Sequence, residues 1–181
     1  IVFGDWSSDV CSSDLNHNEL IEDLSSPLGA VRLTNMYFPK GNVSDNGIIE
    51  CRKHIEGVLE DFVLPHFREY VFDKFAGTSG TIFSTLQILE RKEAGTYLQS
   101  LNGGIIKREK LFKLEEQILS KRTIEERLNI KGLEQKRADI FPAGIIILSE
   151  IFKAFGIKQL YVSTYAMREG MVLQYQQNIQ F

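Results

Sequence analysis

The most apolar stretch of the chain runs from Asp139 to Phe155. Placed on a helix, its hydrophobic residues leave no continuous polar face, which is typical of a helix that is buried on most sides. Asp139 is positioned to cap the start of this helix, and Pro142 is tolerated in its first turn. Gly156 is positioned to end it. The pattern therefore predicts that the most buried helix of the fold lies here.

A second, amphipathic helix is predicted over residues 48–68. Apolar residues recur there three, four and seven positions apart, so they line one face of the helix. Pro65 weakens the last turn, because proline has no backbone N–H and its ring clashes with the preceding turn. The apolar residues between positions 30 and 38 fit either a strand or a short helix.

Three further helices follow from weaker patterns. Leucine and isoleucine recur at helical spacing over residues 105–119. Thr123 and Glu126 have the spacing of a capping box, which predicts a short helix through Leu128. Residues 167–177 form the last predicted helix of the chain.

Short strands are predicted near residues 19–25, 70–76 and 158–163. Residues 70–76 alternate roughly as a strand does and are rich in aromatic and β-branched residues. The third strand contains the β-forming run Leu160-Tyr161-Val162. Together with the helices, these strands predict one α/β domain in which helices cover a small mixed sheet.

Composition narrows the class of protein. A length of 181 residues suits one domain with a hydrophobic core. The formal net charge of −3 provides no basic surface for nucleic acid, and no apolar run approaches the ~20 residues that span a bilayer. Two cysteines, Cys11 and Cys51, provide neither a disulfide framework nor a metal-binding spacing. These features predict a cytoplasmic protein that binds neither nucleic acid nor membrane.

The first fifteen residues differ in character from the rest of the chain. Residues 4–15 read GDWSSDVCSSDL and resemble the translation of a sequencing adapter, and the segment lacks the basic start and long apolar centre of a signal peptide. We therefore expect residues 1–15 to be a non-native artefact without native contacts, and residues 16–181 to form the domain. On this interpretation the natural chain is interrupted at the adapter, and the sequence is a C-terminal piece of a longer protein.

A glycine-rich turn stands between the second predicted strand and an apolar run at helical spacing. It comprises Gly77, Thr78, Ser79, Gly80 and Thr81. Glycines permit close approach to the backbone, while the unpaired N–H groups and the positive dipole end of a helix start favour an anion. The alternative is structural, namely a tight turn in which Ser or Thr caps the helix.

Other ionisable residues lack the spacing of a catalytic or metal site. Glu115 and Glu116 are adjacent, as are the acids at 125–126, and adjacent helix residues do not face each other. Both pairs are therefore expected on solvated faces and are poor acid–base dyads. The three histidines lack metal-ligand spacing and have no cysteine or carboxylate to complete a site. No metal ligand is assigned.

Four sequence blocks, in this order, resemble the exopolyphosphatase/guanosine pentaphosphate phosphatase (Ppx/GppA) family. They are residues 26–34 (SPLGAVRLT), 77–81 (GTSGT), 131–139 (KGLEQKRAD) and 162–170 (VSTYAMREG). Each block alone is weak, but the four together are specific. The resemblance implies the second lobe of the two-lobed actin-like ATPase fold, which is ribonuclease H-like, with the first lobe missing.

The resemblance also implies an activity. Family members release terminal phosphate from inorganic polyphosphate or from the alarmone pppGpp by attack of water on a phosphoanhydride, with Mg²⁺ as the implied cofactor. Arg137 resembles a family arginine that grips the phosphorylated ligand, and it joins the residues of the glycine-rich turn as the expected phosphate-binding set. The alternative for Arg137 is a helix-end charge or an ion pair with Asp139.

The resemblance places the catalytic base, the metal ligands and two phosphate loops outside this chain, so no catalytic residue is assigned and the chain alone is expected to be inactive. Polyphosphate or guanosine penta- or tetraphosphate is the expected partner, and a homodimer is left open. Two other classes stay open, a non-catalytic module that binds an alarmone or phosphate ligand, and a lobe of another actin-like ATPase. Arg168 and Glu169 are expected to pair structurally.

Overall fold

The computed structural model describes residues 2–6, 9–16, 19–93 and 98–165. Its strands are β1 (Val2–Trp6), β2 (Asp9–Asn16), β3 (Glu19–Ser26), β4 (Ala76–Thr78), β5 (Ile105–Lys107) and β6 (Gln159–Val162). They form a six-stranded sheet in the order β3-β2-β1-β4-β6-β5. The pairs β1–β4 and β4–β6 are parallel, whereas β1–β2, β2–β3 and β5–β6 are antiparallel, so the sheet is mixed.

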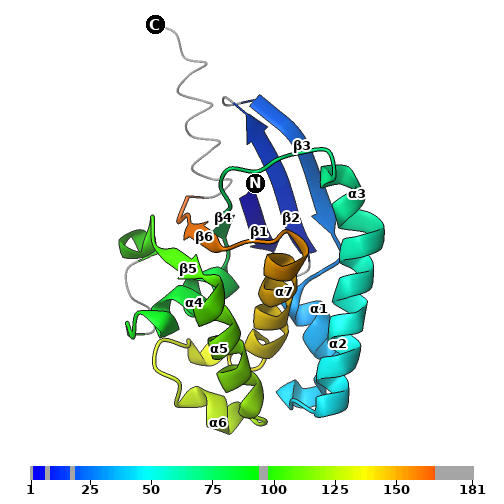
Figure 1. The fold of residues 1–181 in the computed structure, drawn as a ribbon. Helices are drawn as coiled ribbons and strands as arrows, with labels where there is room; N and C mark the ends of the chain where they lie inside the picture. The colour runs from blue at the N-terminus through cyan, green and yellow to red at the C-terminus, as the bar shows by residue number, and fades with distance from the viewer. Residues whose placement is uncertain (1, 7–8, 17–18, 94–97, 166–181) are drawn as a thin grey trace, which may run out of the picture.

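Seven α-helices accompany the sheet in the described part of the chain. They are α1 (Ala30–Tyr37), α2 (Asp45–Val58), α3 (Leu64–Phe67), α4 (Gly80–Leu89), α5 (Arg108–Ser120), α6 (Ile124–Leu128) and α7 (Phe141–Ala154). α7 contacts α1, α2, α4 and α5 and lies in the middle of this helical layer (Figure 1). The predicted α/β class, with helices covering a small mixed sheet, is confirmed.

The prediction that the 139–155 segment forms the most buried helix agrees with the structure. Every residue of α7 from Phe141 to Phe152 is buried. Ile146 is fully inaccessible to solvent, and Ile147 is 5% exposed. Burial on all sides explains why this segment carries no polar face.

The ends of α7 were predicted only in part. Pro142 stands in the first turn, and Gly156 follows the helix with a φ of +64°, as expected. The predicted cap by Asp139 is wrong, because Ile140 is the N-cap residue and has no side-chain cap. The Asp139 carboxylate instead accepts a hydrogen bond from the neighbouring Ile140 N–H at 2.9 Å. Asp139 therefore lies one residue too early to cap the helix.

The predicted helix over residues 48–68 is present but interrupted. α2 begins with Ser44 as its N-cap, and a π-helical turn, η2 (Leu59–Val63), separates α2 from α3. Pro65 stands in the first turn of α3. Because proline cannot donate a hydrogen bond to the preceding turn and its ring crowds that turn, the helix widens before it. The prediction that Pro65 weakens the helix is thus consistent with the structure.

Several local predictions are confirmed. Strands β3 and β6 occupy the segments predicted near 19–25 and 158–163. Residues 30–38 take the helical alternative as α1. The capping box opens α6, with the Thr123 N–H donating to the Glu126 carboxylate at 3.0 Å and the Glu126 N–H to the Thr123 hydroxyl at 3.3 Å. The helix predicted over 167–177 lies outside the described residues.

The strand predicted over residues 70–76 is wrong, since β4 begins only at Ala76. The preceding loop carries Phe72 and Phe75, whose rings lie 6.2 and 6.4 Å from the ring of Phe155. Phe72 also lies 6.2 Å from the buried Phe67. The alternating apolar residues of this segment therefore belong to a loop whose aromatic side chains form a cluster. Such a loop has the same sequence pattern as a half-buried strand.

The helix predicted over residues 105–119 is present, but it begins three residues later than predicted. Ile105–Lys107 form β5 at the edge of the sheet, antiparallel to β6, and α5 begins at Arg108. Ile106 is fully buried while Ile105 is 41% exposed, which is the alternation of an edge strand. Three residues are too few to display that period clearly in a sequence, and the helical spacing of the following residues dominated the pattern.

The expectation that the first fifteen residues make no native contacts is contradicted by the strand pairing. β1 lies between β2 and β4, with Val2–Gly4 in register with Ala76–Thr78. Strand pairing uses backbone N–H and C=O groups that every sequence carries, so an unusual composition did not exclude it. The adapter origin of residues 4–15 is a separate matter and stays a prediction.

Gly132, in the loop after α6, provides a stability prediction. Its φ is +92°, and an added Cβ would lie 2.9 Å from the backbone of Gln87 and Ile88 in α4. Gly132→Ala should therefore lower the free energy of unfolding by about 2 kcal/mol or more in urea titrations, through strain and steric crowding together. Gly103→Ala is the matched control, because Gly103 also has a positive φ of +77° but faces open space. An equal loss in the two variants would contradict the crowding argument.

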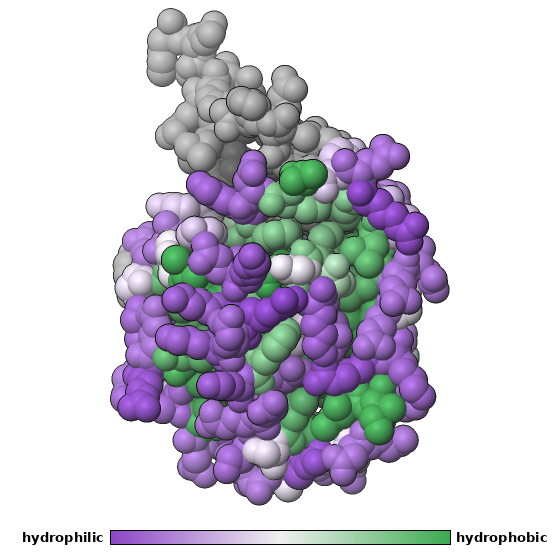
Figure 2. All heavy atoms as spheres, in the orientation of Figure 1, coloured by the Kyte–Doolittle hydropathy of each residue, from purple (hydrophilic) through white to green (hydrophobic). Residues whose placement is uncertain are grey.

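Polar side chains cover most of the face seen in Figure 2, and apolar atoms are visible between them. This is the arrangement expected when the helices direct their apolar sides toward a shared core. Within the described residues, no helix is both long and apolar enough to cross a bilayer.

Candidate functional site

The glycine-rich turn connects the sheet to a helix, as the sequence predicts. Gly77 and Thr78 end β4, Ser79 is the N-cap residue of α4, and Gly80 begins the helix. The Ser79 Oγ accepts a hydrogen bond from the Ile82 N–H at 3.1 Å. The structural alternative, an N-cap, is therefore present. It is compatible with an anion site, because the Ser79 hydroxyl still has a proton to donate and N–H groups of the first helical turn point out of the helix end.

The other residues of the turn differ in what they face. Gly77 is buried, and an added Cβ there would lie 2.5 Å from the Cδ1 of Ile82. Thr81 is buried with its hydroxyl toward α7, where an added Cβ on Gly144 would lie 2.6 Å from the Thr81 Oγ1. Thr78 is half-buried at the end of β4. Gly77 and the Thr81 side chain therefore belong to the packing of the turn, while the backbone from Gly80 onward forms the start of α4.

Arg137 lies directly over this turn. It ends the short 3₁₀ turn η4 (Gln135–Arg137), and a Cβ added to Gly80 would collide with the Cζ, Nη1 and Nη2 atoms of its guanidinium. Only a residue without a side chain allows this approach. The structure thus brings together two predicted site segments that are more than fifty positions apart in the chain.

The guanidinium of Arg137 is only loosely paired. Its Nε lies 3.6 Å from the Glu134 Oε2, which is longer than a hydrogen bond, and 29% of its side chain is exposed. Glu134 is also approached by Lys136, whose Nζ lies 3.1 Å from the same oxygen. Asp139, the alternative partner predicted for Arg137, is exposed and accepts from the Ile140 N–H. The arrangement therefore offers a positive charge beside a helix N-terminus.

A second arginine, Arg127 of α6, was not singled out from the sequence. It is fully buried and donates hydrogen bonds to three backbone carbonyls, one of which belongs to Ala138, next to Arg137. An arginine after two glutamates on a short helix has the pattern of a solvated face, so its neighbours in sequence did not indicate burial.

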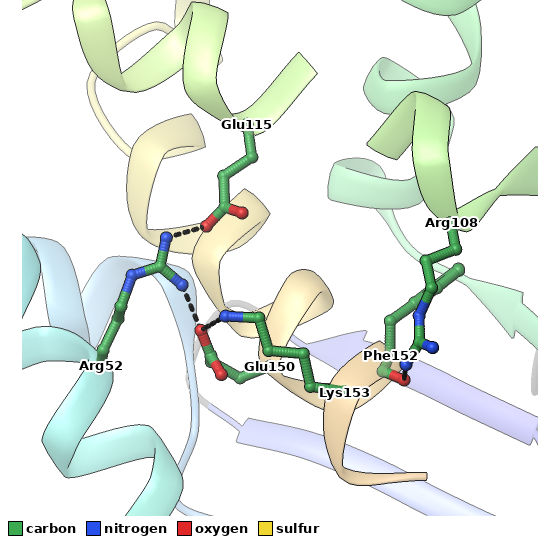
Figure 3. Close-up of polar contacts among 6 residues, drawn as sticks. All are labelled: Arg52, Arg108, Glu115, Glu150, Phe152 and Lys153. Atoms are coloured by element: carbon green, nitrogen blue, oxygen red, sulfur yellow. Dashed lines mark hydrogen bonds and ion pairs between the residues drawn. The ribbon is translucent and has the colours of Figure 1, made fainter. Parts of the chain in front are cut away.

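An ion-pair cluster with two buried carboxylates joins three helices (Figure 3). Arg52 of α2 donates to Glu115 of α5 at 2.6 Å and to Glu150 of α7. Glu150 also accepts from Lys153 at 2.8 Å. The side chains of Glu115 and Glu150 are 6% and 3% exposed. The prediction of a solvated Glu115 is wrong, because its burial depends on an arginine 63 positions away in the sequence.

The chemistry of this cluster favours a structural role. Burial raises the pKa of Glu115, and the nearby charge of Arg52 opposes that rise. The two carboxylates and two cations balance one another, and each buried charge has a partner, as buried charges require. Cys51 beside the cluster is also buried, and burial raises the pKa of its thiol to about 12. A thiol with this pKa stays protonated and unreactive at neutral pH.

Among the residues that the structure describes, no group of three His, Cys, Asp or Glu side chains could hold a metal ion. The candidate site is therefore the helix N-terminus with Arg137, which has donors and positive charge but no carboxylate set. Such an arrangement can bind phosphate oxygens, through bidentate contacts from the guanidinium and N–H groups from the helix.

Comparison with known proteins provides an independent view. A model of the Ppx/GppA phosphatase family matches residues 12–178. A Haemophilus influenzae protein named provisionally as an exopolyphosphatase is 33% identical over 156 residues, which cover 86% of this chain and 46% of that protein. The chain thus spans about half the length of this curated relative.

Solved structures agree on the fold. An Aquifex aeolicus member of the Ppx/GppA family superposes with a TM-score of 0.85 at 20% identity, over 99% of this chain and 56% of that chain. A Cytophaga hutchinsonii exopolyphosphatase gives a TM-score of 0.80 at 20% identity, over 99% of this chain and 57% of that one. At these identities the likeness concerns the fold alone, and it confirms the expected fold class.

Proposed function

Because the chain belongs to the Ppx/GppA phosphatase family, we propose that it is the part of a phosphohydrolase that grips the phosphate chain of its substrate. The substrate class is an oligophosphate, either inorganic polyphosphate or a guanosine penta- or tetraphosphate. The reaction is attack of water on the terminal phosphoanhydride, which releases inorganic phosphate. The curated relative, named provisionally as an exopolyphosphatase, supports this reaction class.

One observation carries the proposal: the Arg137 guanidinium lies over Gly80 at the N-terminus of α4. An oligophosphate carries charge on every phosphate, so it gains from a cation and a helix dipole that act on neighbouring groups. The Ser79 hydroxyl can donate a third hydrogen bond at the same helix end. Sequence, local geometry and electrostatics therefore support the proposal of phosphate oxygens as the ligand.

The site's contribution to the reaction is electrostatic. In phosphoanhydride hydrolysis negative charge develops on the transferred and leaving phosphate oxygens, and donors fixed in advance stabilise that charge. Arg137 and the start of α4 can orient the chain and hold its leaving portion. A general base that takes the proton of the attacking water is assigned to no described residue, and the loss of such a base costs about 10²–10⁴ in rate. We therefore expect the 181-residue chain alone to bind an oligophosphate but not to hydrolyse it.

The family resemblance implies Mg²⁺, yet the described residues contain no cluster of three suitable ligands. These residues do not form a metal site by themselves. The roles assigned to this chain are limited to binding and orienting phosphate.

Arg137→Ala provides the test. The variant should bind tripolyphosphate about tenfold more weakly than the wild type in isothermal titration calorimetry, because it loses a bidentate charge-assisted contact. Orthophosphate, which occupies only the helix end, should lose less. Lys136→Ala is the matched control, since the neighbouring Lys136 is 77% exposed and lies outside the turn. Equal effects of the two variants would show that Arg137 contributes only general charge.

A further inference from the structure

We propose that Arg127 is a positioning residue of the phosphate site: its buried guanidinium fixes the backbone turn that holds Arg137 over Gly80. The inference rests on the proposed function, because it assigns a role within that same site. It adds a residue that donates hydrogen bonds to the carbonyls of Ala138, Lys121 and Gly41 and acts on the site through Arg137.

The contacts of Arg127 are unusual for a buried cation. Its Nε donates to the Ala138 carbonyl at 2.6 Å, its Nη1 to the Lys121 carbonyl at 2.6 Å, and its Nη2 to the Gly41 carbonyl. All three acceptors are neutral backbone groups, and the side chain has no solvent exposure. Burial lowers the pKa of Arg127, consistent with the cost of removing a charge from water. An apolar side chain at this position would leave the three carbonyls without this donor, so the guanidinium ties specific backbone positions together as well as filling space.

The three carbonyls belong to three different segments. Gly41 ends the 3₁₀ turn η1 (Pro39–Gly41), Lys121 is the C-cap residue of α5, and Ala138 lies between η4 and α7. A guanidinium is planar and directs its donors along several fixed directions, so one side chain can hold all three segments at set distances. An ammonium group offers donors from a single nitrogen and cannot reproduce this spread.

The bond to Ala138 connects this anchor to the phosphate site. Ala138 is fully buried and immediately follows Arg137. On the other side, the Arg137 N–H donates to the Glu134 carbonyl at 2.9 Å. The backbone of Arg137 is therefore held from both directions, and its long side chain starts from a fixed point. Because a misplacement of about 1 Å can cost about 10²-fold in reaction rate, this fixed point matters for holding phosphate in the reacting geometry.

Arg127→Lys tests the inference, since it keeps the positive charge and removes the planar guanidinium with its several fixed donors. We expect tripolyphosphate affinity in calorimetry to fall about tenfold at a temperature where circular dichroism shows a folded protein. The informative readout is a double-mutant cycle with Arg137→Ala: when Arg137 is already absent, Arg127→Lys should cause little further loss. Arg127→Gln is a second variant, which retains an amide donor without charge and should show the same coupling.

Arg52→Lys is the matched control. It makes the same change at another arginine that bonds across helices, but its partners are Glu115 and Glu150 rather than the turn at Arg137. It should lower thermal stability and leave tripolyphosphate affinity unchanged. An equal loss of affinity in Arg52→Lys, or full additivity of Arg127→Lys with Arg137→Ala, would overturn the positioning role. If Arg137→Ala itself leaves the affinity unchanged, the proposed phosphate site is wrong, and the inference is wrong with it.

Discussion

A Gly80→Val variant is expected to lose measurable binding of tripolyphosphate in calorimetry. The Cβ of any residue at this position would occupy the space of the Arg137 guanidinium, so the arginine must swing away from the helix start. The valine branches would also block close approach of a phosphate to the N–H groups of the first turn. Both components of the site are therefore removed by one substitution, and the effect should exceed that of Arg137→Ala.

Two further variants separate loss of the site from loss of the fold. Gly57→Val places the same side chain in α2, where an added Cβ meets no atom within 4 Å, and should leave binding unchanged. Gly80→Val combined with Arg137→Ala removes the collision, so thermal stability should recover while binding stays absent. Wild-type affinity in folded Gly80→Val would contradict the assignment of the site.

An Arg52→Met variant is expected to show the largest loss of stability. It leaves Glu115 buried without its ion-pair partner and Glu150 paired with Lys153 alone, and breaking a buried ion pair typically costs about 3–5 kcal/mol. For a domain of this size that corresponds to a fall in Tm of about 6–20 °C by differential scanning calorimetry. Arg122→Met is the control, because Arg122 pairs with Asp45 at an exposed position and such pairs contribute about 1 kcal/mol or less.

The same variant should have a distinctive pH dependence. Burial already raises the pKa of Glu115 above its ordinary value of 4.5, and Arg52 opposes that rise. Without Arg52 the pKa rises further, so the folded protein binds this proton more tightly than the unfolded chain does. The free energy of unfolding then falls as the pH rises through the window above 4.5.

Arg52→Met should therefore regain part of its lost stability when the pH is lowered from about 7 to about 5, whereas Arg122→Met should not. Urea titrations at the two pH values measure the difference. A deficit of Arg52→Met that is independent of pH would mean that the buried carboxylates are not the cause of its instability.

Local sequence patterns predicted the elements whose burial is evident along the chain. α7 is apolar on every face, and the capping box of α6 is complete within four residues. Patterns failed where tertiary contacts determine the structure. The loop that carries Phe72 and Phe75 packs these aromatic rings against Phe155, so its sequence has the pattern of a strand although its backbone is not one. β5 has too few residues to show its own period before the helix that follows.

The candidate site was predictable in its parts but not in its assembly. Gly80 and its neighbours are contiguous, so their place at a strand–helix junction could be derived from the sequence. Arg137 was singled out by family resemblance, and its position over Gly80 depends on the packing of α4 against the segment before α7. The sequence did not indicate the roles of Arg127 and Arg52, since a charged residue on a short or amphipathic helix is expected on the solvent-exposed face unless its distant partners are known.

The most direct test of the phosphate site is a ¹H–¹⁵N NMR titration of the 181-residue chain with tripolyphosphate. A phosphate site at the start of α4 predicts that the largest shifts occur at the backbone N–H groups of Ser79 and Gly80 and at the Nε–H of Arg137, and that these signals move together with one dissociation constant. Absence of shifts at these three groups, or larger shifts at a different surface, would contradict it.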